Sequence, residues 1–310
     1  MQAAVHLPQV PFAGPATELP ARARDVVDAA GDLGFVAVSA NDHFTFSTQW
    51  VDGLMLLASI AERAGPLELM TTVALPALRG PVAFASSITA LAAMSKGRVV
   101  AGVGPGSSAA DHGLAGLDWS RRWQRYDETL QVLRSLLGGD GVPAGLRFYA
   151  PADQPTAVLT DVPHVQLWPA SWGSEAGLRR VAAHGEGWLA SAYHTSPDEF
   201  GLARTRLEAA LRRRGADPGG FGHAVVTMWT YVSDRPETTR RILADVLAPA
   251  LGRAPDALRG RVCVGSPAEC TRLVGAYAAQ GCRRMHFWPI ADEVEQLELL
   301  AHHVLPGVVQ

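Results

Sequence analysis

The chain has 310 residues, of which 48% are hydrophobic, and its formal net charge at pH 7 is −3. This length and hydrophobic content suffice for one large domain or two ordinary ones. Charged residues make up only 18% of the sequence, so neither nucleic acid nor a membrane surface is expected as a partner. No early apolar run has the shape of a signal peptide, and no segment has the length of a membrane-spanning helix.

The cysteine and lysine contents restrict the chemistry further. Cys263, Cys270 and Cys282 are odd in number and lack C-x-x-C spacing, which favours reduced thiols and a cytoplasmic location. Lys96 is the only lysine beside 26 arginines. Covalent lysine chemistry would therefore have to use Lys96.

Hydrophobic periodicity predicts strands that alternate with helices along the whole chain. The predicted strands cover residues 2–9, 35–40, 67–75, 98–103, 165–168, 187–191, 225–232 and 284–288. The predicted helices cover residues 19–33, 50–64, 81–94, 121–137, 174–183, 196–214, 236–251 and 266–279, and a last helix begins at 292. Capping boxes at 196–199 and 266–269 support two of these helix starts.

This alternation favours a (β/α)8 TIM barrel of the α/β class, formed as one domain by residues 1–310. Residues 138–163 are turn-rich and weakly patterned, and we interpret them as an insertion within that domain. A doubly wound open sheet is the alternative. In a barrel, the carboxyl ends of the strands form one rim, where ligand chemistry is found.

The residues at the predicted rim exclude several kinds of chemistry. No H-x-H follows the first strand and no paired His/Asp cluster is present, which argues against a metal site. Lys96 precedes the fourth strand and so belongs to the opposite end of the barrel. Schiff-base and pyridoxal-phosphate chemistry are therefore not expected.

The run from Val99 to Ser108 changes abruptly from β-branched residues to glycine and serine, as strands do where they end at a ligand. It matches neither the dinucleotide fingerprint, because Ser107 replaces the third glycine, nor a P-loop. A tight turn without a ligand explains this run equally well.

Two further features of the rim point to ligands. Ser171-Trp172-Gly173-Ser174 directly precedes a helix, whose positive end and backbone N–H groups at Gly173 and Ser174 suit a phosphate. Arg122 and Arg125 are candidates to add charge there, whereas a plain N-cap serine is the alternative. His43 follows a predicted strand beside Asp42, which would orient it, and a structural histidine is the alternative.

Several motifs together resemble the luciferase-like flavin-dependent oxidoreductases. They are Gly97–Ser107 with Arg125–Glu128, Ser171–Val181 with Gly187–Leu189, Asn41–Phe44, and Thr71–Val73. The resemblance spans nearly the whole chain. It implies a (β/α)8 barrel, usually a homodimer, that binds reduced FMN or the deazaflavin coenzyme F-420, with a flavin reductase as a candidate supplier of the reduced cofactor.

The resemblance also implies site residues. A non-proline cis peptide at Thr72–Val73 would support the isoalloxazine ring, and the cofactor phosphate would lie at Gly173–Ser174. Deazaflavin-using relatives often carry a glutamate where this chain has Ser107 and Ser108, so the choice of cofactor stays open. The cofactor-binding residues expected are Asn41, Thr72, Val73, Gly104, Ser107, Arg125, Trp172, Gly173 and Ser174.

We therefore expect a flavin- or deazaflavin-dependent oxidoreductase, either a monooxygenase or a reductase/dehydrogenase, acting on a small organic substrate. His43, oriented by Asp42, is the expected proton donor or acceptor. The expected lining of an apolar substrate pocket is Trp50, His194, Trp229 and Trp288. The alternatives are a cofactor- or partner-binding barrel that has lost the reaction, and a sugar-phosphate isomerase with Asp42 as its base.

Overall fold

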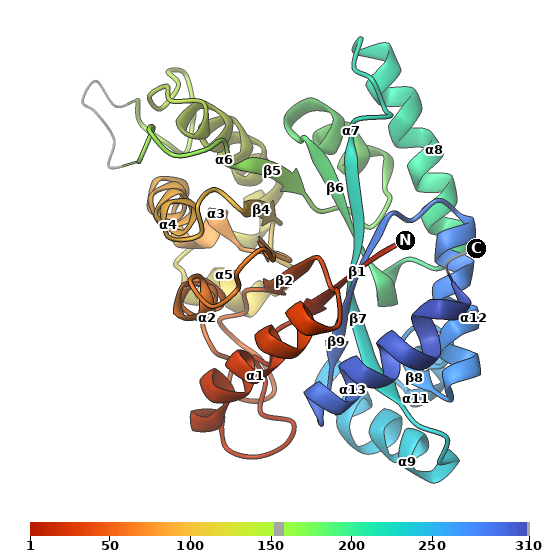
Figure 1. Cartoon of the computed structure of the whole chain (residues 1–310). Coiled ribbons are helices and arrows are strands. Elements are labelled where there is room, and N and C mark those ends of the chain that lie inside the picture. The colour runs from red at the N-terminus through yellow and green to blue at the C-terminus, as the bar shows by residue number, and fades with distance from the viewer. Residues whose placement is uncertain (152–157, 309–310) are drawn as a thin grey trace.

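The computed structural model describes residues 1–151 and 158–308, and within them eight parallel strands form a nearly closed barrel (Figure 1). The strand order is β5-β4-β3-β2-β1-β9-β7-β6, and an isolated bridge between Ala170 and Leu189 joins the two ends. The predicted barrel is thus confirmed, and an open doubly wound sheet is wrong. The strands are β1 (Gln2–His6), β2 (Ala37–Ala40), β3 (Glu68–Thr71), β4 (Val99–Val103), β5 (Gln166–Pro169), β6 (Gly187–Ser191), β7 (Gly222–Val232) and β9 (Arg284–Pro289).

The longer helices surround the barrel. They are α1 (Leu19–Asp32), α2 (Gly53–Ile60), α4 (Pro81–Met94), α6 (Arg122–Leu137), α7 (Glu175–His184), α8 (Pro197–Arg213), α12 (Pro267–Ala279) and α13 (Glu293–Leu299). The predicted helix 236–251 consists of α9 (Pro236–Arg241), a π-helical turn (Ile242–Leu247) and α10 (Ala248–Leu251). Shorter elements are α3 (Pro76–Arg79), α5 (Ala109–Leu114), α11 (Pro255–Leu258), 3-10 turns at 16–18, 119–121, 192–194 and 305–307, and a π-helical turn at 300–304.

β8 (Cys263–Gly265) and α5 are among the short elements that had no sequence prediction. β8 adds to β7 outside the barrel, and its three residues are too few to show alternation. α5 has six residues, one of them glycine, and no apolar spacing. Both elements are fixed by the neighbours they pack against, which a periodicity analysis does not detect.

Buried apolar side chains form three groups that differ in position. The largest lies between the barrel and its helices and includes Val38, Leu69 and Phe287. The second fills the barrel interior with residues such as Met70 and Trp168. The third lies beyond the barrel at the rim and is built around two tryptophans. Strands buried on both faces explain the near-continuous apolar runs seen in the sequence.

Residues 138–151 and 158–163 connect α6 to β5 along the outside of the barrel. The carboxylate of Glu128 on α6 accepts the backbone N–H groups of Arg147 and Phe148, at 3.0 and 2.8 Å. The Leu159 N–H donates to Thr89 on α4 at 3.3 Å. The interpretation of 138–163 as an insertion stays a prediction, and residues 152–157 lie outside the described residues.

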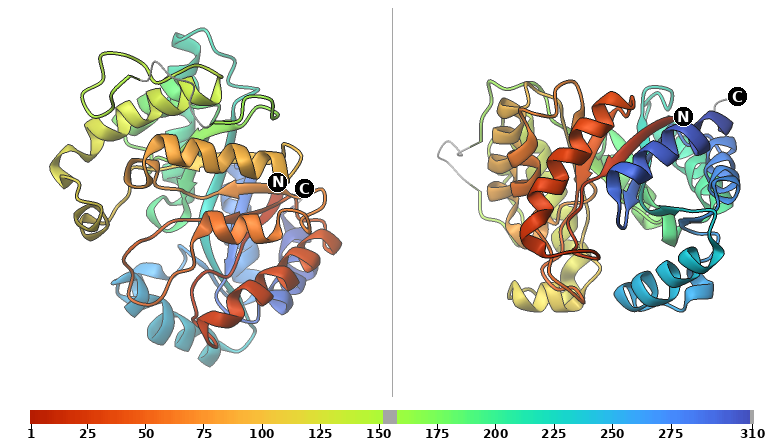
Figure 2. Two further views of the ribbon diagram at one scale, coloured as in Figure 1. Left: turned by 90° about the vertical axis from the view of Figure 1, so that its left-hand side faces the viewer. Right: turned by 60° about the horizontal axis from the view of Figure 1, so that its bottom comes forward.

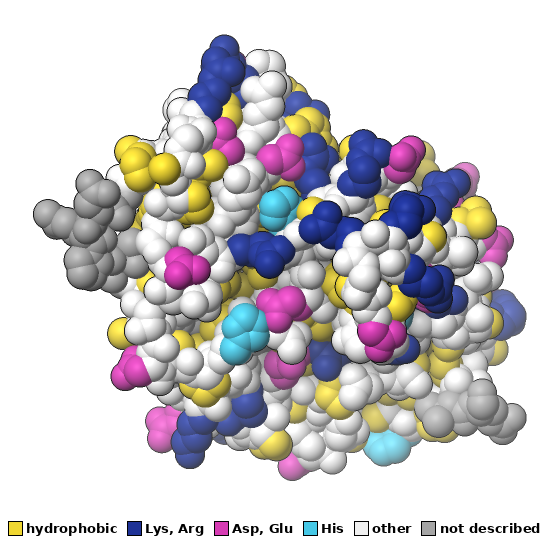
Figure 3. Space-filling view, turned by 90° about the horizontal axis from the view of Figure 1, so that it is seen from above, with side chains coloured by type: hydrophobic (Ala, Val, Ile, Leu, Met, Phe, Trp, Pro, Cys, Tyr) yellow, Lys and Arg dark blue, Asp and Glu magenta, His cyan; other side chains and the backbone are white. Residues whose placement is uncertain are grey.

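The two ends of the barrel differ in character. In Figure 1, β7 and β9 run downward toward α9, and Figure 2 shows the barrel from two further sides. Figure 3 views the end where the strands begin, and there basic side chains are interspersed with acidic ones. Lys96 directly precedes β4 and so belongs to that second end. Among the residues that the structure describes, no helix combines the length and apolar character needed to cross a membrane.

Candidate active site

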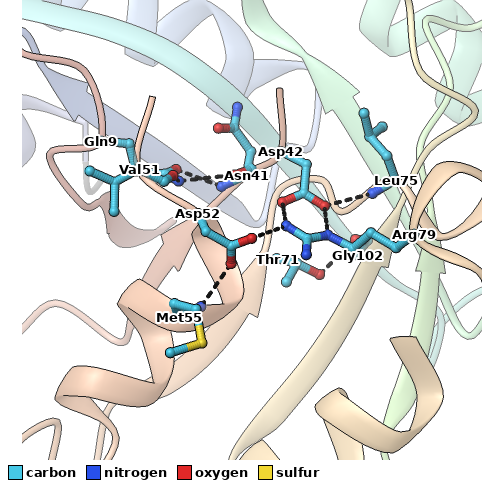
Figure 4. A network of polar contacts seen from close by, with 10 residues as sticks. All are labelled: Gln9, Asn41, Asp42, Val51, Asp52, Met55, Thr71, Leu75, Arg79 and Gly102. Atoms are coloured by element: carbon cyan, nitrogen blue, oxygen red, sulfur yellow. Dashed lines mark hydrogen bonds and ion pairs between the residues drawn. The ribbon is translucent and has the colours of Figure 1, made fainter. Parts of the chain in front are cut away.

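A buried glutamine fixes the chain where β2 ends (Figure 4). The side-chain amide of Gln9 donates to the carbonyl oxygens of Asn41, at 3.0 Å, and Val51, at 2.8 Å. Its oxygen accepts the Asn41 N–H at 2.7 Å. Gln9 therefore holds the segment after β1, the end of β2 and the approach to α2 in one place.

The carboxylate of Asp42 belongs to a different network. It accepts two hydrogen bonds from Arg79, at 2.7 Å each, and the Leu75 N–H at 3.0 Å (Figure 4). Arg79 also donates to Asp52 at 2.6 Å, and Asp52 caps α2 by accepting the Met55 N–H. Burial lowers the pKa of Arg79, but the bonds and charges of the two carboxylates outweigh this and raise it.

The prediction that Asp42 orients His43 is therefore wrong. Successive side chains of an extended segment point to opposite sides, so neighbours in sequence seldom share a partner. Asp42 turns toward Arg79, while His43 turns toward Asp111, with 3.4 Å between His43 Nδ1 and Asp111 Oδ2. That separation is typical of an ion pair and long for a hydrogen bond.

Asp111 is fully buried and held by its own partners. Its Oδ1 accepts the backbone N–H of Thr45 at 2.7 Å and also the Thr45 hydroxyl. Ser108 caps α5 by accepting the Asp111 N–H at 3.1 Å. Burial raises the pKa of Asp111, but the nearby His43 ring and the bonds from Thr45 outweigh it and lower the pKa. Asp111 is therefore an ionised partner for His43 at neutral pH, and Ser108-x-x-Asp111 has the spacing of a helix-capping motif that would have drawn attention to it.

The peptide bond between Thr72 and Val73 is cis, as the resemblance implies. Gly102 at the end of β4 and Gly104 just after it are explained by their closeness to this segment. A Cβ on Gly102 would lie 1.9 Å from the Thr71 carbonyl oxygen, and one on Gly104 would lie 2.7 Å from Val73 Cγ2. These two glycines therefore serve the packing of β4 against β3, and Ser107 is exposed beyond them.

Several buried polar atoms at this rim lack a partner among the residues that the structure describes. They include Asn41 Oδ1, Thr72 Oγ1, His6 Nε2, Trp50 Nε1 and Trp229 Nε1. Buried polar groups without partners are uncommon, so such atoms indicate where a ligand makes hydrogen bonds. Flavin and deazaflavin rings carry carbonyl oxygens and N–H groups along one edge. Asn41 and Thr72, beside the cis peptide, therefore fit such a ring.

At the predicted phosphate turn, Ser174 caps α7 by accepting the Gly177 N–H at 3.2 Å. The Gly173 N–H donates to Ser171 Oγ at 3.1 Å. The N-cap alternative is thus confirmed for Ser174, and the Gly173 N–H already has a partner. A phosphate role for this turn stays a prediction that rests on Ser174 and the first turn of α7.

Arg125 makes contacts other than those expected. Its guanidinium lies 4.4 Å from the ring centre of Phe148 and 5.9 Å from that of Tyr149. Arg122 lies over Trp119, at 3.9 Å. Within the described part of the chain, no hydrogen bond or ion pair joins either arginine to Gly173 or Ser174.

His194 also departs from the expected grouping. Its ring stacks on the half-exposed Trp172 at 3.8 Å, and its Nδ1 lies 3.0 Å from Ser191 Oγ. Burial, with the nearby charges of Arg253 and Arg261, lowers the pKa of His194 to about 4, so it is neutral at pH 7. In the described structure, its aromatic neighbours are Trp172 and Tyr193 and not the three other predicted pocket residues.

Those three tryptophans do come together beside His43. Trp288 stacks on Trp229, with ring centres 3.9 Å apart, and on His6, at 3.5 Å. Trp50 packs edge-on against Trp288, at 5.7 Å, and against His43, at 4.8 Å. We call Trp50, Trp229 and Trp288 the tryptophan cluster. The rim thus combines an imidazole–carboxylate pair with a largely buried aromatic surface.

Comparison with known proteins agrees with this fold. The family model described as luciferase-like monooxygenase matches residues 1–254. The chain therefore belongs to this family of barrel enzymes. Membership of this family indicates an oxidoreductase, and it specifies neither the cofactor nor the reaction.

Curated relatives include a phthiodiolone/phenolphthiodiolone dimycocerosates ketoreductase from Mycobacterium sp. (strain JLS), which is 28% identical over 64% of this chain and 53% of the relative. A 5,10-methylenetetrahydromethanopterin reductase from Methanolobus tindarius is 27% identical over 61% of this chain and 55% of the relative. The matched part of the chain thus spans about half the length of these relatives.

Solved structures share the whole fold at low identity. Monooxygenase RslO1 from Streptomyces bottropensis has a TM-score of 0.83 at 19% identity and 99% coverage of both chains. An F420-dependent secondary alcohol dehydrogenase in complex with an F420-acetone adduct has a TM-score of 0.83 at 18% identity, covering 100% of this chain and 99% of that one. The oxygenating constituent of 3,6-diketocamphane monooxygenase from Pseudomonas putida, in complex with FMN, has a TM-score of 0.75 at 15% identity, covering 100% and 99%.

Proposed function

We propose that this protein is a flavin- or deazaflavin-dependent oxidoreductase that transfers a hydride equivalent to or from a small organic substrate bearing a carbonyl or alcohol group. The observation that carries the proposal is the His43–Asp111 pair, 3.4 Å apart, next to the tryptophan cluster and the Thr72–Val73 segment. Relatives whose names describe a ketoreductase and a secondary alcohol dehydrogenase support this class of substrate.

The chain's own residues would hold reduced FMN or coenzyme F-420, which supplies the two-electron chemistry when bound. Thr72 would pair with the polar edge of its ring, because its buried hydroxyl lacks another partner among the described residues. Asn41, whose side chain lies beside His6, would be a second contact to that edge. Val73 would support the ring face. Ser174 and the first turn of α7 would receive the phosphate.

His43 would exchange the proton that accompanies hydride transfer at the substrate oxygen. Its Nδ1 is turned toward Asp111, so Nε2 is the nitrogen available to the substrate. The ionised Asp111 stabilises the protonated imidazole and fixes its orientation. The tryptophan cluster excludes water and packs against the apolar body of the substrate.

A monooxygenase is the second candidate function, supported by the family description and by the two monooxygenases of similar fold. In that case a separate flavin reductase would supply reduced FMN. A homodimer and a cytoplasmic location complete the proposal.

The proposal is tested by incubating the purified chain with oxidised F-420 and a panel of secondary alcohols, and separately with reduced FMN, a ketone and oxygen. Bleaching of F-420 supports the dehydrogenase, whereas oxygen incorporation into the ketone supports the monooxygenase. His43→Gln is expected to lower turnover by about a hundredfold while leaving cofactor affinity unchanged. No turnover with either cofactor across the panel would reject both.

A further inference from the structure

β7 contains a residue with left-handed backbone at its middle. Thr227 has a φ of 60°, a conformation that β-branched residues rarely adopt. The pairing of β7 with β9 shifts at the same place, because Val225 pairs with Met285 while Met228 pairs with Phe287. One extra residue on β7 therefore forms a β-bulge at Thr227.

The bulge reverses which side chains face the barrel axis. Before it, Val226 belongs to the interior group and Val225 to the group beneath the helices. After it, Trp229 belongs to the rim group and Met228 to the group beneath the helices. If Thr227 instead had regular extended backbone, strict alternation from Val226 would turn Met228 inward and Trp229 outward. The strained residue is thus what directs Trp229 to the rim.

The reoriented Trp229 completes a row of rings across three neighbouring strands. Trp229 of β7 pairs in register with Trp288 of β9, and the two rings stack at 3.9 Å with a 20° interplanar angle. His6 of β1 stacks on the other side of Trp288 at 3.5 Å. The row fixes the Trp229 indole from the side while its Nε1 stays buried, with no partner among the described residues.

A buried indole N–H that lacks a partner is a donor for an acceptor on a ligand. Left-handed backbone at a β-branched residue is unfavourable unless the surrounding structure imposes it, and such residues are concentrated at functional sites. Glycine would adopt the same conformation without this penalty. Here the bulge and the unpartnered donor occur two residues apart.

We propose that Thr227 is a positioning residue that turns Trp229 into the site, and that the Trp229 indole N–H donates a hydrogen bond to the carbonyl or hydroxyl oxygen of the substrate. This inference rests on the proposed function for the class of substrate, but its structural part is independent of any cofactor. The ligand class is an uncharged ketone or secondary alcohol with an apolar body that packs against the tryptophan cluster.

The test uses the full chain and three variants: Thr227→Gly, Thr227→Pro and Trp229→Phe. Stacked indoles give a paired signal in ultraviolet circular dichroism, and the Trp229→Phe difference spectrum assigns it. Thr227→Gly adopts a positive φ readily and is expected to keep this signal. Thr227→Pro keeps the extra residue but fixes its φ at about −65°, so it is expected to abolish the signal. A folded Thr227→Pro variant that retains the signal would overturn the positioning role.

The donor role is tested with cyclohexanone and with methylenecyclohexane, which has a similar shape but no oxygen. The isotope-labelled indole N–H resonance of Trp229 is expected to shift with the ketone and not with the hydrocarbon, in the parent chain and in Thr227→Gly. Trp229→Phe is expected to weaken ketone binding by roughly three- to tenfold. An unmoved Trp229 resonance, or unchanged ketone affinity in Trp229→Phe, would overturn the donor role even where the Thr227→Pro variant does not fold.

These outcomes are distinguishable from a failure of the proposed function. A chain that binds neither FMN nor F-420, yet shows the paired signal and the ketone-dependent shift, contradicts the proposed function and retains this inference. A chain that turns over ketones while its Trp229 resonance stays unmoved supports the proposed function and contradicts this inference.

Discussion

Asp42 and Arg79 form a two-point ion pair, with both bonds 2.7 Å long, and the Asp42 side chain is only 2% exposed. The pair joins the end of β2 to α3. The intervening cis segment is held from both sides, because the Asp42 N–H donates to Val73 and its carboxylate accepts the Leu75 N–H. Asp42 is therefore a residue that positions the candidate cofactor site.

Replacing Arg79 tests that assignment. Arg79→Met leaves the buried Asp42 carboxylate without its main partner, and we expect the free energy of unfolding to fall by about 3–5 kcal/mol. Urea denaturation measures the change. Arg63→Met is the matched control, since it breaks the exposed ion pair with Asp28 and is expected to have a much smaller effect. Equal losses in the two variants would contradict a special role for Arg79.

Asp111→Asn tests the partner of His43. The amide keeps the size of the carboxylate and an acceptor for Thr45, but it lacks the charge that stabilises a protonated imidazole. We expect kcat to fall roughly a hundredfold with little change in thermal stability. Asp118→Asn, at the exposed cap of the turn 119–121, serves as the control and should leave kcat unchanged. A kcat for Asp111→Asn equal to that of the control would show that the pair is not used.

The buried histidines predict how stability depends on pH. Burial lowers the pKa of His6 from 6.5 to about 3, despite an opposing bond to the Leu7 carbonyl, and burial also lowers that of His286. Both rings are neutral in the folded protein but accept protons near pH 6.5 once unfolded.

The unfolded state thus binds more protons below that pH, and the free energy of unfolding decreases as the pH falls from 6.5 toward 3. Each histidine contributes a slope of at most about 1.4 kcal/mol per pH unit. His6→Gln should reduce the slope measured by urea denaturation over this interval. A slope that is identical in His6→Gln would contradict this account of His6.

Two glycine-to-alanine variants test the packing of the motif after β4. Gly102→Ala would bring a Cβ to 1.9 Å from the Thr71 carbonyl oxygen, so we expect a loss of at least about 1–3 kcal/mol. Gly113→Ala on α5 meets no atom within 4 Å, and we expect a gain of about 0.5–1 kcal/mol. Thermal denaturation compares them, and a stable Gly102→Ala would mean that β4 and β3 are less tightly packed than described.

The barrel was predictable because parallel strands buried on both faces leave a strong local pattern. The capping boxes at 196–199 and 266–269 fixed two helix starts for the same reason, since each is a contact within one turn. The cis peptide was predicted from the family resemblance. The tryptophan cluster was predicted because its members lie at the rim of the barrel.

The pairing of the site residues was not predictable, because the partners come from distant parts of the chain. Arg79 is 37 positions from Asp42, and Asp111 lies on a short helix without apolar spacing. Adjacency suggested that Asp42 and His43 act together, whereas the extended backbone separates their side chains. The bulge at Thr227 was equally hidden, since a threonine in a β-branched run gives no sign of left-handed backbone.

The most direct measurement of the central claim is an anaerobic titration of the purified chain with reduced FMN and with coenzyme F-420, followed by tryptophan fluorescence. We predict saturable micromolar binding of at least one of them. Thr72→Val, which removes the unpartnered hydroxyl at constant shape, should weaken that binding by roughly three- to tenfold. Saturation by neither cofactor would contradict the assignment of this rim as a flavin or deazaflavin site.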